Sequence, residues 1–213
     1  MANETPLQER KVSIQILLIV VFCIMAAGVN FGLNSLFVFV FRIPLFLDTM
    51  FTAAVTFILG LWPGLFTAVL TQILMSIRKG NPDPFVICVI VEVLLIWRLN
   101  PVKNAKRLNA GNIPVGTSIF ARLLFLYIIC CISVSILGGI IDFFYYGTWL
   151  FPKPYFSAED TFKIGLLQSD FHLLAINILS RIPVNIIDRF IVIFGGFFLS
   201  KGFLALERVR RLR

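Results

Sequence analysis

Long apolar runs, separated by short polar segments or by Gly and Pro, make up most of the chain. A helix needs roughly 20 apolar residues to cross a bilayer, so the runs predict a compact all-α bundle of about six membrane-spanning helices. They fall at about residues 12–33, 45–60, 63–77, 85–97, 118–141 and 182–204. The second, third and fourth runs are short, and one of them could be re-entrant if it lines a polar cavity.

Gly and Pro mark the breaks between the runs. Residues 60–64 hold two glycines and a proline, so one helix is expected to end there and the next to begin. Residues 78–84 are expected to form a loop, and residues 164–180 a further helical stretch. Pro183 is expected to kink or restart the last helix, because proline lacks the N–H group that a helix interior uses.

The composition supports a membrane protein. The 213 residues are 59% hydrophobic and 14% charged, with a mean hydropathy of +0.93. No soluble domain of this size needs so much apolar surface. Six spans leave no room for a second folded domain, so residues 1–213 are expected to form one integral domain in the lipid bilayer. The first run continues from Val12 to about Phe41, which is too long for a signal peptide and predicts an uncleaved helix.

The distribution of basic residues predicts the orientation. The net charge is +8, which in a soluble protein would suggest nucleic-acid binding. Here the positive-inside rule already explains the charge, so no nucleic-acid partner is expected. If the N-terminus is inside, twelve of the 19 Lys and Arg residues lie at the inner side. Both termini are basic, and an even number of spans places both in the cytoplasm.

Polar side chains collect at the outer ends of these spans. A polar group at membrane depth is costly and usually functional, so the cluster predicts a water-accessible substrate pocket that opens outward. The alternative is an interhelical hydrogen-bond network, in which Asp48 or Asp188 pairs with Arg42 or Arg181. The mixture of charges suggests a polar or zwitterionic ligand. The residues are Asn30, Asn34, Arg42, Asp48, Gln72, Arg78, Arg181, Asn185 and Asp188.

Two further features are candidates for ligand contact. Glu92 lies near the middle of its span, where it is either a ligand or proton site or a protonated carboxyl bonded to a neighbouring helix. The loop that follows residue 141 is rich in aromatic residues, among them Trp149. These aromatic residues form either an interfacial belt or a lid that stacks on a flat ligand.

The sequence shows no catalytic, metal or cofactor signature. It lacks nucleophile-elbow, zinc-protease and phosphate-cradling motifs. The four cysteines lie inside apolar runs without metal-ligand spacing, and a single histidine cannot form a metal site alone. We therefore expect a protein that is not an enzyme, binds no metal or cofactor, and depends on a partner for energy.

The first span carries small residues that could dock a partner. Gly28 and Gly32 form a GxxxG pattern, preceded by Ala26 and Ala27. Small residues let two helices approach closely, either inside the bundle or against another protein.

Two stretches resemble a known family. They are the segment from Arg42-Ile-Pro-Leu-Phe-Leu-Asp48-Thr49 through Gly60-Leu-Trp-Pro63-Gly64, and Arg181-Ile-Pro-Val-Asn185-Ile-Ile-Asp188-Arg189. They resemble the substrate-binding S components of energy-coupling factor (ECF) transporters. The resemblance implies a six-helix protein of the prokaryotic plasma membrane that captures a vitamin-like small molecule on the outer side. It also implies docking, through small residues of the first helix, to a transmembrane T subunit that works with two cytoplasmic ATPase subunits.

Two other classes stay open at this point. One is a transmembrane sensor or receptor domain, which would act with a separate signalling partner because the last span is followed by only a short basic tail. The other is a structural or assembly factor, for which a bundle interior without polar groups is expected.

Overall fold

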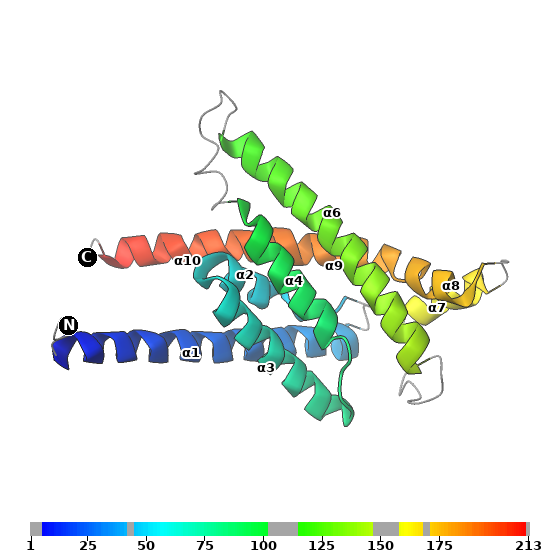
Figure 1. Ribbon diagram of the computed structural model, residues 1–213, viewed down its shortest axis with the longest axis horizontal. Coiled ribbons are helices and arrows are strands. Elements are labelled where there is room, and N and C mark those ends of the chain that lie inside the picture. Colours follow the sequence, from blue (N-terminus) through cyan, green and yellow to red (C-terminus); the bar gives the residue numbers. More distant parts are fainter. Residues whose placement is uncertain (1–5, 42–44, 102–114, 147–157, 168–170, 212–213) are drawn as a thin grey trace, which may run out of the picture.

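The computed structural model describes residues 6–41, 45–101, 115–146, 158–167 and 171–211, and every regular element within them is helical (Figure 1). The η elements are π-helical turns that each continue the preceding helix. The elements are α1 (Pro6–Ser35), η1 (Leu36–Val40), α2 (Met50–Leu59), α3 (Leu61–Lys79), α4 (Val86–Leu99), α6 (Val115–Ile141), η2 (Asp142–Tyr146), α7 (Ala158–Leu166), α8 (Leu173–Leu179), α9 (Ile182–Phe190), η3 (Ile191–Gly195) and α10 (Gly196–Arg211).

Among the described residues, four helical runs are long and apolar enough to cross a membrane: Ser13–Val40, Leu61–Lys79, Ile119–Tyr145 and Leu173–Ala205. Helices α2 and α4 have 10 and 14 residues. At 1.5 Å per residue they reach about 15 and 21 Å, which is less than the roughly 30 Å of a hydrocarbon core. The protein is thus an all-helical chain whose long apolar helices suit a membrane, while the six-span count and the cytoplasmic termini stay predictions.

Some boundaries differ from the expected ones. Helix α3 continues through Lys79 and ends at Gly80, whose φ of +70° is a left-handed cap conformation, so residues 78 and 79 are helical and not part of a loop. The first run stays helical to Val40, because its apolar pattern outlasts one bilayer thickness. The helix expected at 164–180 is instead two short ones, α7 and α8.

The expected breaks at Gly60 and Pro183 are present. Gly60 adopts φ +94°, which favours glycine, and reverses the chain between α2 and α3. Gly64 then brings α3 close to α2, since a Cβ atom there would lie 2.2 Å from Thr56 Oγ1. Pro183 lies in the first turn of α9, where its missing N–H group costs no helical hydrogen bond.

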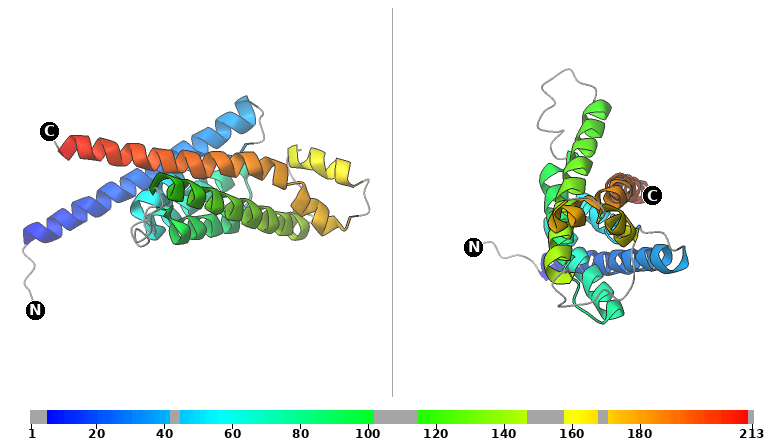
Figure 2. Two further views of the ribbon diagram at one scale, coloured as in Figure 1. Left: turned by 90° about the horizontal axis from the view of Figure 1, so that it is seen from above. Right: turned by 90° about the vertical axis from the view of Figure 1, so that its right-hand side faces the viewer.

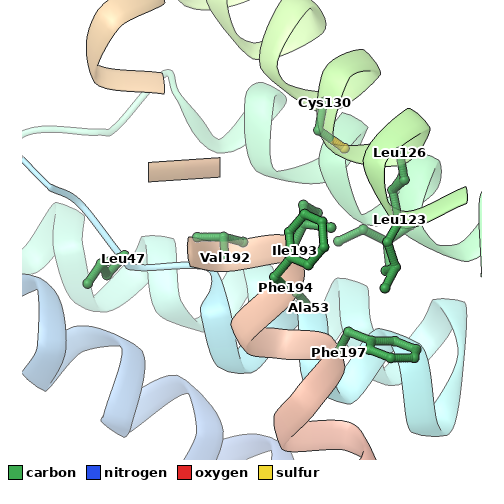
Figure 3. Close-up of a cluster of buried hydrophobic side chains, with 10 residues drawn as sticks. Leu47, Ala53, Leu123, Leu126, Cys130, Val192, Ile193, Phe194 and Phe197 are labelled. Atoms are coloured by element: carbon green, nitrogen blue, oxygen red, sulfur yellow. The ribbon is translucent and has the colours of Figure 1, made fainter. Parts of the chain in front are cut away.

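A buried apolar cluster joins α2, α4, α6, η3 and α10 (Figure 3). Gly196 permits this packing, because a Cβ atom there would lie 2.8 Å from Ala53 Cβ and 2.9 Å from the Met50 carbonyl oxygen. The last helical run therefore packs directly on α2. The cluster consists of Leu47, Ala53, Ile96, Leu123, Leu126, Cys130, Val192, Ile193, Phe194 and Phe197.

The start of α1 and the end of α10 extend from the same end of the molecule (Figure 2). Residues 13–21 of α1 are exposed on all sides although most of them are apolar. The Phe22 and Phe203 rings, 5.4 Å apart, hold α1 against α10 just beyond that stretch. Such exposure suits a surface covered by lipid or by another protein.

Candidate functional site

Arg189 is the centre of a buried ionic cluster. Its side chain is 5% exposed, and its NH1 group donates to Glu92 Oε2 and, over 3.1 Å, to Thr49 Oγ1. Its NH2 group donates to Asp188 Oδ2. A buried charge is tolerated when it is paired and hydrogen-bonded, as these contacts provide. Arg189 thereby links α9, α4 and the start of α2.

Asp188 also holds the loop before α2. Its Oδ1 atom accepts hydrogen bonds from the Phe46 and Leu47 backbone N–H groups, over 3.1 and 3.0 Å. Leu47 has φ +41°, which is rare for a bulky residue and costs on the order of 1–3 kcal/mol. We call residues 45–48 the strained loop. The Asp188 contact compensates for its backbone conformation and fixes the direction of Asp48.

Asp48, the last residue of the strained loop, contacts Gln72 of α3. Gln72 Nε2 donates to Asp48 Oδ2 over 3.3 Å, while Gln72 Oε1 is buried and has no hydrogen-bond partner among the described residues. Asp48 is partly exposed, and within the same residues it forms no ion pair. Its negative charge therefore faces a neutral amide.

Helix α1 joins the network through two asparagines. Asn34 Nδ2 donates to the Phe46 carbonyl oxygen over 2.9 Å, and Asn34 Oδ1 accepts from Arg78 NH2 over 2.7 Å. Arg78 also lies over the Phe31 and Phe39 rings. Asn30 Nδ2 donates to Thr52 Oγ1 over 2.9 Å, which binds α1 to α2. The strained loop thus contacts both α1 and α9.

Arg181 belongs to a separate ionic cluster. Its Nε and NH2 groups lie 3.1 and 3.0 Å from Asp142 Oδ2, which also accepts from Lys163 Nζ over 2.7 Å. The Arg181 guanidinium lies over the Phe85 ring, 4.5 Å from its centroid. This cluster joins the turn between α8 and α9 to η2 and α7. Asn185 lies between the two clusters, where Nδ2 donates to Ser135 Oγ over 2.9 Å.

The structure brings together five of the predicted site residues around the strained loop and Arg189: Asn34, Asp48, Gln72, Glu92 and Asp188. Arg78 joins them through Asn34. Asn30, Arg181 and Asn185 make other contacts, and Arg42 and Trp149 lie outside the described residues.

The observed ion pairs differ from the expected ones. Asp188 pairs with Arg189, its neighbour in sequence, and not with Arg181. Arg181 pairs with Asp142, which the polar pattern did not single out as a site residue. Arg189 is also missing from the predicted set, although a guanidinium within the apolar run 182–204 was a usable signal.

The expected docking residues of α1 divide into two pairs. Ala26 and Ala27 are buried inside the bundle, where Ala26 packs with Cys23 and Val55. Gly28 and Gly32 are exposed, and a Cβ atom at either would have no neighbour within 4 Å. The alanines therefore serve internal packing, whereas the glycines are open to lipid or to a partner.

The network keeps three buried polar atoms without a hydrogen-bond partner among the described residues: Gln72 Oε1, Glu92 Oε1 and Arg189 Nε. Leaving a buried polar atom unpaired is unfavourable, so each is a point where water or a ligand would be stabilised. In the part of the chain that the structure describes, no group of three or more His, Cys, Asp or Glu side chains could hold a metal ion. The arrangement suits binding of a polar molecule.

Comparisons with known protein families, with curated proteins and with solved structures found no match to this chain. The function is therefore inferred from the contacts around the strained loop and Arg189 and from the sequence resemblance.

Proposed function

We propose that this chain is the substrate-binding membrane subunit of an ECF-type importer, which captures a vitamin-like small molecule on the outer side of a prokaryotic plasma membrane. One observation carries the proposal. Around the strained loop, a buried network of charged and amide side chains from α1, α3, α4 and α9 retains polar atoms that have no hydrogen-bond partner within the described part of the chain. A structural bundle in a membrane has no need for so many buried charges.

Two further features support a ligand site at this place. The strained backbone at Leu47 is the kind of feature that clusters at ligand-binding sites. The π-helical turn η3 begins two residues after Arg189, and such turns are frequent at functional sites. Helix α9 lies toward the end of the molecule away from the two termini (Figure 1), so cytoplasmic termini would place the network on the outer side.

The proposal assigns the energy step to partners. The chain would work with a transmembrane T subunit and two cytoplasmic ATPase subunits, and the exposed Gly28 and Gly32 offer a close-approach surface for a partner helix. A sensor domain would use the same ligand site but a signalling partner. Mass spectrometry of chains that co-purify from native membranes distinguishes the two, because only the importer brings a transmembrane T subunit together with two transporter ATPase subunits.

The binding step is tested first. The purified protein in nanodiscs, produced in rich medium, is denatured and its released small molecules are identified by mass spectrometry, with an unrelated membrane protein prepared in parallel. A compound released in near-stoichiometric amount from this chain alone is the expected result. Release of no such compound from any rich medium would contradict the proposal.

The orientation has its own test. The four cysteines are buried and free, so a cysteine introduced at Asn81 can be labelled selectively. Labelling at Asn81 by an impermeant reagent from outside, and at Lys103 from inside only, is expected. Labelling at Lys103 from outside would reverse the topology and move the site to the cytoplasmic side.

A further inference from the structure

Asp48 differs from every other acidic residue whose side chain the structure describes. Asp83 pairs with Lys79 over 2.5 Å, and Asp142 pairs with Arg181 and Lys163. Glu92 and Asp188 share the Arg189 guanidinium. Within the described residues, the hydrogen bond that Asp48 accepts comes from the neutral Gln72 amide. A carboxylate without a cationic partner at membrane depth is costly, so the position calls for a positive charge.

Gln72, which contacts the Asp48 carboxylate, offers a second hydrogen-bond acceptor through its Oε1 atom. Gln72 is 4% exposed and uses its Nε2 donor on Asp48, and its buried Oε1 acceptor has no hydrogen-bond partner among the described residues. An amide oxygen and a carboxylate side by side can both be satisfied by a group with several N–H donors. An anionic ligand group would instead lie against the Asp48 charge and be repelled.

Arg189 acts on Asp48 through space but forms no ion pair with it among the described residues. Its NH1 and NH2 groups are already bound to Glu92, Thr49 and Asp188. Asp48, Glu92 and Asp188 all act electrostatically on this one guanidinium. Three carboxylates around one cation leave an excess of negative charge. Asp188 also holds the backbone just before Asp48 through its contacts to the Phe46 and Leu47 N–H groups.

We propose that Asp48 and Gln72 form the subsite for a positively charged nitrogen of the ligand, so that the substrate is a molecule of net positive charge with an ammonium group or a protonated ring nitrogen. This inference rests on the proposed function and specifies its substrate class. The partly exposed Asp48 carboxylate receives the positive charge, and Gln72 Oε1 accepts one N–H group.

The experiment uses yeast extract separated by ion exchange into cationic, neutral and anionic fractions. Each fraction is added at equal dry mass to the purified full chain in detergent, and thermal unfolding is followed by intrinsic fluorescence. The cationic fraction is expected to raise the unfolding midpoint of the wild-type chain by about 4 °C or more, since ligands stabilise the state that binds them. The anionic fraction is expected to cause no shift.

Two variants locate the effect. Asp48→Asn keeps the shape of the side chain and removes its charge, so the cationic fraction should no longer shift its midpoint, while its ligand-free midpoint stays at or above that of wild type. Asp83→Asn is the matched control, because Asp83 lies in the electrostatic neighbourhood of Asp48 but already has Lys79 as a partner. This variant should keep the full shift.

The outcomes separate the two proposals. A shift caused only by the neutral or anionic fraction overturns the cationic subsite and leaves the proposed binding function intact. A cationic shift that persists in Asp48→Asn overturns the role of Asp48, and a ligand-free midpoint several degrees below wild type in Asp48→Asn shows that Asp48 is structural. Absence of a shift with all fractions counts against the binding function itself.

Discussion

Two arginines eight positions apart on the last helical run, Arg181 and Arg189, are nearly equally buried, with 7% and 5% of their surface exposed. Their surroundings differ. Arg189 binds carboxylates of α4 and α9 and a threonine before α2, all inside the bundle. Arg181 binds Asp142 at the end of α6, together with Lys163 of the short helix α7.

We assign the two clusters different roles: the Arg189 cluster belongs to the proposed binding site, and the Arg181 cluster ties helices together. The Arg189 cluster pairs two carboxylates with one guanidinium, whereas the Arg181 cluster pairs one carboxylate with two cations. The Arg181 cluster lies where Gly138 and Gly139 bring α6 against the turn before α9 and against α8. Its position indicates that it holds η2, α7 and α8 together. Removing one partner of a buried pair costs about 3–5 kcal/mol, whereas exposed pairs contribute about 0–1 kcal/mol.

The largest effect is expected for Arg189→Met. It leaves the Glu92 and Asp188 carboxylates buried without their cation, so the free energy of unfolding should fall by about 3–5 kcal/mol. Denaturant unfolding in detergent measures the change, and the matched control is Arg98→Met, because Arg98 is exposed. Adding Glu92→Gln to Arg189→Met should restore part of the loss. A loss of less than about 1 kcal/mol would mean that the cluster is not a paired, buried unit.

A smaller effect is expected where the second cluster approaches α8. A Cβ atom at Gly139 would lie 2.7 Å from Ile178 Cα and 2.8 Å from its backbone nitrogen, and backbone atoms cannot move aside easily. Gly139→Ala should therefore cost about 1–3 kcal/mol through forced separation of α6 and α8. Gly28→Ala, where no atom lies within 4 Å, is the control and should be neutral or slightly stabilising in its helix. Equal results for the two variants would contradict the close packing.

The smallest effect is expected for Lys163→Met. The Lys163 side chain is 16% exposed, and Asp142 keeps its bonds to Arg181 without it, so the global free energy of unfolding should fall by about 1 kcal/mol or less, the net value of one hydrogen bond. The local effect should be a less stable α7, because this helix loses its ion pair with Asp142 of η2. Limited proteolysis should cleave near α7 faster in the variant. A global loss as large as that of Arg189→Met would remove the distinction between the two clusters.

The sequence pattern predicted those features of the fold that depend on residues close together in the chain. The apolar runs, the turn at Gly60 and the restart at Pro183 follow from chemistry within a few residues, and the structure confirms them. Helical spacing also selected Asp188, at i+3 from Asn185. It did not select Arg189, because that residue follows Asp188 directly and lies about 100° away around the helix, off the polar stripe.

Contacts between distant segments could not be predicted in this way. Phe46 and Asp188 are 142 positions apart, and Asp142 and Arg181 are 39 apart. No spacing rule connects such pairs, since only the packing of α6, α9 and the strained loop brings them together. The positive φ of Leu47 was equally hidden, because a leucine carries no sequence signal for a left-handed backbone.

The contact between Asp188 and the strained loop must break before the backbone of this loop can open. The Phe46 and Leu47 amide hydrogens are both held by the single Oδ1 atom of Asp188, so neither can exchange with solvent deuterium until that contact breaks. The two amides should therefore share one free energy of opening, so that their exchange rates differ only by their intrinsic rates. Because the released Leu47 would relax to a negative φ, each opening also relieves backbone strain, and reclosing must restore it. At the proposed binding site, the loop would act as a latch whose opening rate limits how fast a ligand could pass it.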